Sequence, residues 1–241
     1  MFGRYSLDEE GLIYAGGEWD ESKYDTFKPT KDNVLLITDE DYFEDDIVHR
    51  FVEFVRVAYG DETLDENLEF IADNLTGRGS PREKIRNYFI TNFYKDHCQQ
   101  YSVRGSGKLP LYWMYDSSAG KTRRNSADGF KALVYMHRYD EDTTGKVRMD
   151  YLHKVQRAYG QRIDNLEYQM ELTDSAREIA DAEKEIEKLT KQLKELQDYD
   201  EKIGHLALSR IPIDLDDGVR VNYDKIQTDE NGKKLKILAK R

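Results

Sequence analysis

Residues 179–196 read IADAEKEIEKLTKQLKEL, and their apolar side chains recur at intervals of three and four positions. That spacing places Leu189 and Leu193 on one face of a helix and leaves Glu and Lys on its flanks. The same spacing runs through residues 159–170, and the polar residues 173–175 separate the two segments. We therefore expect two antiparallel helices whose apolar faces pack against each other as a coiled coil.

Upstream of these helices, two apolar runs are typical of a β-hairpin. Residues 109–115 form an aromatic-rich run, and residues 130–137 form its expected partner. The polar residues 116–129 would connect the two strands as a mobile tip. A short buried strand is also expected at residues 34–38.

Three helices are expected between the first strand and the hairpin. An apolar stripe over residues 47–58 predicts the first helix, with Gly60 as its stop. Capping boxes that begin at Thr63 and at Ser80 predict the starts of the next two. The acidic run at 39–46 is interpreted as the solvated start of the first helix, because consecutive acids do not converge on a metal ion.

The last part of the chain is predicted to be a short β tail. Residues 211–215 and 219–223 have the composition of short strands around a turn, and the polar residues after Thr228 are expected to fray.

The expected fold class is α+β and helix-rich. A mixed α/β domain with helices and the basic β-hairpin would cover residues 1–140, and the antiparallel helical hairpin would cover residues 141–210. The β tail would cover residues 211–241.

Composition excludes several classes of protein. The chain has 241 residues, a net charge of −11 and 35% charged residues. It holds no apolar run of the ~18 residues that cross a bilayer, and its start does not resemble a secretory signal. A single cysteine, Cys98, excludes an intrachain disulfide and a cysteine-clustered zinc site. We expect a soluble cytoplasmic protein that makes no contact with membranes.

The charge is unevenly distributed along this acidic chain. Residues 78–131 hold eleven Lys and Arg against four Asp and Glu. Such a segment attracts a polyanion that the rest of the chain repels. The candidate DNA-binding residues lie at the tip and the base of the expected hairpin, and they are Arg104, Lys108, Lys121, Arg123 and Arg124. The helices and hairpin loosely suggest a winged-helix layout, and the alternative is a solvated cationic loop beside an acidic body.

The sequence completes none of three catalytic or metal-binding motifs. The string around Lys121 resembles the end of a phosphate-binding P-loop, but it lacks the earlier glycine and a following helix. The string at 214–218 resembles a calcium loop, but Lys225 stands where the bidentate Glu is required. The histidines show no zinc-protease spacing.

Several longer strings carry a resemblance to a known family. They run along nearly the whole chain, as GLIYAGGEWD at 11–20, DYFEDDIV at 41–48, EFIAD at 69–73, LPLYW at 109–113, GFKALVYMHRY at 129–139 and DLDDGV at 214–219. They resemble the C-terminal region of the PglX family, the large adenine-specific DNA methyltransferases of BREX phage-exclusion systems.

The resemblance implies transfer of a methyl group from S-adenosylmethionine to the N6 of adenine by the full-length enzyme. This chain lacks both the glycine-rich cofactor loop and a motif of the Asn-Pro-Pro-Tyr type. We therefore expect no catalytic, cofactor-binding or metal-binding residue here, and S-adenosylmethionine would serve only the full-length family. The implied partners are double-stranded DNA, the methyltransferase core and other BREX proteins.

Two main functional hypotheses remain open at this stage. In the first, the chain is a DNA-binding, specificity-type segment that lacks the catalytic core. In the second, it is a coiled-coil assembly module of the defence complex without direct DNA contact. Methyl transfer by this chain alone is a third and weaker hypothesis, because no catalytic motif supports it.

Overall fold

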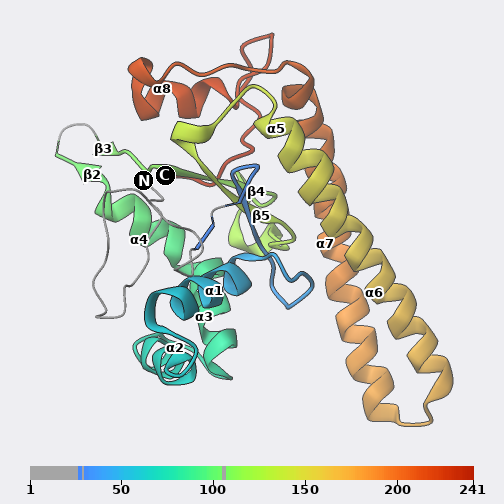
Figure 1. Ribbon diagram of the computed structural model, residues 1–241. Coiled ribbons are helices and arrows are strands. Elements are labelled where there is room, and N and C mark those ends of the chain that lie inside the picture. The colour runs from blue at the N-terminus through green and yellow to red at the C-terminus, as the bar shows by residue number, and fades with distance from the viewer. Residues whose placement is uncertain (1–26, 29, 105–106) are drawn as a thin grey trace.

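The structure is a computed structural model that describes residues 27–28, 30–104 and 107–241 (Figure 1). The string quoted above at 11–20 lies outside the described residues. The strands are β1 (Val34–Ile37), β2 (Ser102–Val103), β3 (Gly107–Lys108), β4 (Tyr112–Asp116) and β5 (Lys131–Tyr135). The α-helices are α1 (Ile47–Tyr59), α2 (Leu64–Asp73), α3 (Pro81–Thr91), α4 (Phe93–Gln100), α5 (Thr143–Lys146), α6 (His153–Leu172), α7 (Ala176–Leu208) and α8 (Gly218–Lys225). Short 3-10 turns are η1 (Arg123–Asn125), η2 (Met136–Arg138) and η4 (Leu215–Asp217), and η3 (Val147–Leu152) is a π-helix.

An antiparallel sheet with the strand order β1-β5-β4 forms the centre of the fold. Trp113 lies opposite Val134, and Val134 in turn lies opposite Val34 on the other side. The expected pairing of the two aromatic and apolar runs is therefore confirmed, and so is the strand at 34–37.

The two faces of the sheet are both buried, because successive side chains on a strand point to opposite faces. Trp113 and Tyr115 pack with residues of α6 and α7, whereas Met114 and Leu133 pack with residues of α1, α3 and α4. The sheet is thus a middle layer between two helical layers (Figure 1).

The antiparallel helical hairpin is confirmed. Helices α6 and α7 lie side by side and are joined by residues 173–175, and they extend well beyond the sheet (Figure 1). The 33 residues of α7 correspond to ~50 Å at 1.5 Å per residue. Gln192 and Glu195 are buried on α7 although the heptad spacing places them on a flank, because this half of the helix also contacts the β4–β5 connection.

The observed helix boundaries can be compared with the capping and stop residues that the sequence predicts. Gly60 ends α1 with φ 89°, and its N–H donates to the carbonyl of Arg56 at 2.8 Å. Ser80 begins α3 with a complete capping box. Thr63 precedes α2 as expected, but its capping box is wrong, because its hydroxyl donates to the carbonyl of Tyr59 at 2.8 Å.

The expected β tail is wrong. Residues 215–225 form η4 and α8, in which Val219 and Tyr223, four positions apart, lie on one face of the helix. Tyr223 is buried and Val221 is exposed, as a helix lying on the core requires. The end of the chain is also not frayed, since Leu238 is buried and forms a bridge with Tyr115 beside β4.

These elements confirm a helix-rich α+β fold. None of the helices in the described part of the chain is long and apolar enough to cross a membrane.

Candidate nucleic-acid interface

The connection between β4 and β5 is held by one buried carboxylate on α7, that of Glu195. One of its oxygens, Oε1, accepts hydrogen bonds from the hydroxyls of Ser117 and Ser118 at 2.6 and 3.1 Å and from the N–H of Gly129 at 3.1 Å. The other, Oε2, accepts from the N–H of Ala127 at 2.8 Å and from the ammonium group of Lys121 at 3.2 Å. A single side chain therefore fixes most of the segment that the sequence presents as a loop.

The charge of Glu195 is stabilised by this set of donors. Burial by itself raises its pKa, but the hydrogen bonds from Ala127, Ser117, Gly129 and Lys121 together lower the pKa below its usual value. The carboxylate therefore stays ionised and pairs with Lys121. The expected mobile tip is instead held to α7 at Lys121, because its ammonium group pairs with a carboxylate on a distant helix that the sequence does not indicate.

The other candidate cations lie in two places. The backbone of Arg123 belongs to η1, and Arg124 is exposed beside it. Arg104 and Lys108 lie on a separate small hairpin formed by β2 and β3, which pairs Ser102 with Lys108. Both of these side chains are exposed.

Two cations that the sequence analysis missed lie next to this hairpin. Arg220 of α8 and Arg241 line a pocket of 240 Å³ together with Gly107 and Lys108. We call Arg104, Lys108, Arg220 and Arg241 the basic surface. None of the four forms an ion pair with a carboxylate in the part of the chain that the structure describes.

A second group of charged residues lies at the start of α1. Ligand atoms of Asp41, Asp46 and His49 come within 4.8 Å of one another, which could hold a metal ion. The guanidinium group of Arg86 already contacts both carboxylates, and it donates to the carbonyl of Thr38 at 3.1 Å. Asp46 also caps α1, accepting from two backbone N–H groups. A cation of the protein itself therefore occupies this group, and we place no metal there.

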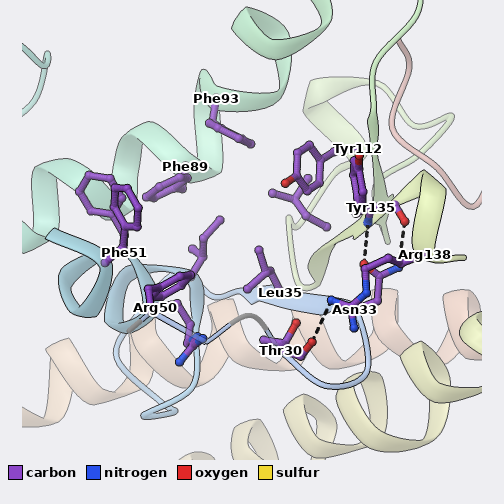
Figure 2. A pocket seen from close by; sticks show the side chains of 14 residues that line it. Thr30, Asn33, Leu35, Arg50, Phe51, Phe89, Phe93, Tyr112, Tyr135 and Arg138 are labelled. Atoms are coloured by element: carbon purple, nitrogen blue, oxygen red, sulfur yellow. Dashed lines mark hydrogen bonds between the residues drawn. The ribbon is translucent and has the colours of Figure 1, made fainter. Parts of the chain in front are cut away.

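A third feature is an apolar cavity of 270 Å³ between the sheet and the helices α1 and α3 (Figure 2). Phe51, Phe89 and Phe93 line one side, and Leu35 and Tyr112 line the other. At its margin, Arg138 donates to the carbonyl of Thr30 at 3.1 Å (Figure 2).

Cys98 and its neighbour His97 have packing roles. Burial raises the pKa of the Cys98 thiol. Burial lowers the pKa of His97, whose Nε2 accepts from the backbone N–H of Tyr112 at 3.1 Å. A neutral, buried thiol is a poor nucleophile.

The chain is similar to enzymes that methylate adenine. It is 47% identical over 233 residues to "Adenine-specific methyltransferase PglX" of Lacticaseibacillus casei (strain Zhang), a match that covers 95% of this chain and 18% of that protein. It is 40% identical over 239 residues to "Adenine-specific methyltransferase BrxX" of Escherichia coli O9:H4 (strain HS), which covers 93% of this chain and 19% of that protein. No protein-family model matches the chain.

These identities show that the chain is homologous to one segment of two proteins that carry the name adenine-specific methyltransferase. In particular, it is homologous to a segment of the proteins named PglX and BrxX. It spans less than a fifth of the length of either relative, which is consistent with one region, such as the C-terminal region.

Proposed function

We propose that the chain is the DNA-binding, specificity-type segment of an adenine-specific methyltransferase of a BREX phage-defence system. The observation that carries this proposal is the basic surface. Lys108, Arg220 and Arg241, from three separate parts of an acidic chain, line one pocket, and Arg104 lies on the same hairpin as Lys108. None of the four has a carboxylate partner among the described residues. Arg and Lys that remain unpaired in this way bind the phosphates of a duplex.

The described residues do not fit a site for S-adenosylmethionine. A methyltransferase cofactor needs a glycine-rich turn after a strand, but β1 is followed by Thr38 and Asp39, and β4 by Ser117 and Ser118. The apolar cavity has no carboxylate in its lining to hold ribose hydroxyls. We therefore assign no methyl-transfer step to these residues and propose that the cofactor binds elsewhere in the full-length protein.

The proposal is tested by equilibrium binding of the purified chain to a fluorescently labelled DNA duplex. The test variant removes the basic surface by changing all four residues to Gln, as Arg104→Gln, Lys108→Gln, Arg220→Gln and Arg241→Gln. The matched control removes four exposed cations of α7, as Arg177→Gln, Lys184→Gln, Lys191→Gln and Lys194→Gln.

We expect the test variant to lose at least ~10-fold in affinity, because each lost phosphate contact no longer releases counterions. The control variant has the same net charge as the test variant, and its affinity for the duplex should fall much less. An equal fall in affinity in the two variants would show that only net charge matters. A wild-type chain that binds no duplex would refute the proposal outright.

A second candidate function, protein–protein assembly, is favoured by the far end of the helical hairpin. Tyr168 and Leu172 are 61% and 70% exposed there, although both are large and apolar. Leu189 is only 1% exposed, so a charge at that position would disrupt the core and could not test assembly. The double variant Tyr168→Ser and Leu172→Ser should instead abolish copurification with the methyltransferase core and leave DNA binding unchanged. Copurification that survives this change would rule out the tip as the docking site.

A further inference from the structure

The pocket within the basic surface is built by residues that are far apart in the chain. Gly107 and Lys108 belong to β3, Arg220 lies on α8, and Arg241 stands more than twenty positions beyond it. They line an open pocket of 240 Å³, and none of the four has an acidic side chain. Three of them carry positive side chains that repel one another, and an anion in the pocket would relieve that repulsion.

Arg241 is held in place by contacts that leave its charge uncompensated. Its Nη1 donates to the backbone carbonyl of Lys108 at 3.2 Å. Its guanidinium carbon lies 5.1 Å from the centre of the Tyr223 ring, a cation–π contact. The Tyr223 hydroxyl donates in turn to the carbonyl of Ala239 at 2.7 Å. A guanidinium group has five N–H donors, so this arrangement orients Arg241 and leaves donors for a ligand.

The positive charge of the pocket residues affects the pKa of a buried thiol, that of Cys98. Lys108 and Arg241 both act to lower the pKa of the buried Cys98 thiol, against the larger effect of burial. Arg220 is exposed at the mouth of the pocket, and the neighbouring Asp216 and Asp217 form no ion pair with it. The pocket therefore presents a positive field with preoriented donors.

We infer that the pocket formed by Lys108, Arg220 and Arg241 binds a single phosphate group of the DNA backbone. This inference rests on the proposed function and assigns one ligand to one part of the basic surface. A phosphate offers several acceptor oxygens, which match the fork of a guanidinium group and the point charge of an ammonium group. A contact of this kind fixes the position of the protein along the duplex and carries no sequence information.

The first arm of the test uses inorganic phosphate alone. The chain is titrated with phosphate and, at matched ionic strength, with chloride, while amide chemical shifts are followed by NMR. We expect phosphate-specific shifts at Gly107, Lys108 and the residues around Arg220. In the variant Arg220→Gln the phosphate affinity should fall at least ~10-fold, as expected when one of three cations is lost. Arg177→Gln, on the exposed start of α7, is the matched control.

The second arm uses duplexes in which one phosphate at a time is replaced by an uncharged methylphosphonate. The affinity of the wild-type chain should fall most when the methylphosphonate stands at one particular position of the duplex. The affinity of Arg220→Gln should not change with replacement at that position, and it should respond like the wild type at the others. Identical phosphate titrations of Arg220→Gln and Arg177→Gln would overturn the inference, as would a wild-type chain with no position-specific loss. Phosphate binding without any duplex binding would refute the proposed function and leave the pocket as an anion site.

Discussion

Replacing Glu195 by Gln tests how the β4–β5 connection is held. The two side chains have the same shape, so the variant changes the charge and one acceptor and leaves the volume alone. A Gln carbonyl can keep the three hydrogen bonds that Oε1 accepts. Its amide group then faces the N–H of Ala127 and the ammonium group of Lys121, and two donors lose their acceptor.

The cost of this change follows from those two lost bonds. A fully buried donor without a partner costs ~1–3 kcal/mol, but both of these donors are part-buried and water can partly replace the lost acceptor. The free energy of unfolding of Glu195→Gln should therefore be about 1–3 kcal/mol lower than that of the wild type. Because the pKa of Glu195 is lowered in the folded state, its ionised form stabilises the fold above the unfolded pKa of ~4.3. That stabilisation disappears as the pH falls through the folded pKa, so the difference between the two proteins should narrow in acid.

The assay is urea denaturation followed by circular dichroism at neutral pH and at acid pH. The matched control is Glu187→Gln on the exposed face of the same helix, where Glu187 only pairs with Lys191. It should leave the unfolding midpoint close to that of the wild type. If Glu195→Gln shifts the midpoint no more than the control does, the carboxylate does not hold the connection and our reasoning fails.

Other substitutions test the packing on either side of this connection. A Cβ at Gly129 would lie 2.2 Å from Cδ1 of Leu196, so Gly129→Ala should destabilise the fold by ~1–3 kcal/mol in urea denaturation. Gly160 lies within α6 with no atom near the position of an added Cβ, so Gly160→Ala should stabilise the fold by up to ~1 kcal/mol. A higher urea midpoint for Gly129→Ala than for Gly160→Ala would contradict this packing. Arg86→Met leaves the carboxylate of Asp46 buried without its partner and should cost ~3–5 kcal/mol, and an unchanged midpoint would show that this pair contributes nothing.

The elements predicted correctly are those whose signals are local. The three-and-four spacing around Leu189 specifies a helix and its buried face within about twenty residues. Ser80 and Gly60 mark helix ends through bonds to residues three or four positions away. The alternating apolar residues of β4 and β5 specify strands in the same way.

The elements that the sequence did not predict depend on contacts between distant residues. Glu195 resembles any other Glu on the flank of a heptad pattern, and only the folded chain brings it to Lys121, 74 positions away. The alternating apolar residues around Arg220 predict a strand, and only the inclusion of Ile226 reveals the helical spacing from Val219 and Tyr223. The basic surface could therefore be anticipated only at Arg104 and Lys108, since no local pattern joins them to α8.

The candidate site was predicted only in part, because it too depends on contacts between residues that are distant in the sequence. A count of charges locates an excess of cations along the sequence, but it does not show which of them meet a carboxylate in the folded chain. Lys121 meets one, whereas Arg104 and Lys108 meet none in the described ranges 27–28, 30–104 and 107–241. Unpaired cations, and not basic composition alone, define a surface that can bind phosphates.

The salt dependence of duplex binding tests the central proposal most directly. The logarithm of the association constant should fall linearly with the logarithm of the salt concentration, with a slope of about −0.9 for each phosphate contact. Removing the four cations of the basic surface should make that slope shallower by several units, whereas the four-cation control on α7 should leave it nearly unchanged. Identical slopes for the wild type and the basic-surface variant would contradict the proposal that these residues hold DNA.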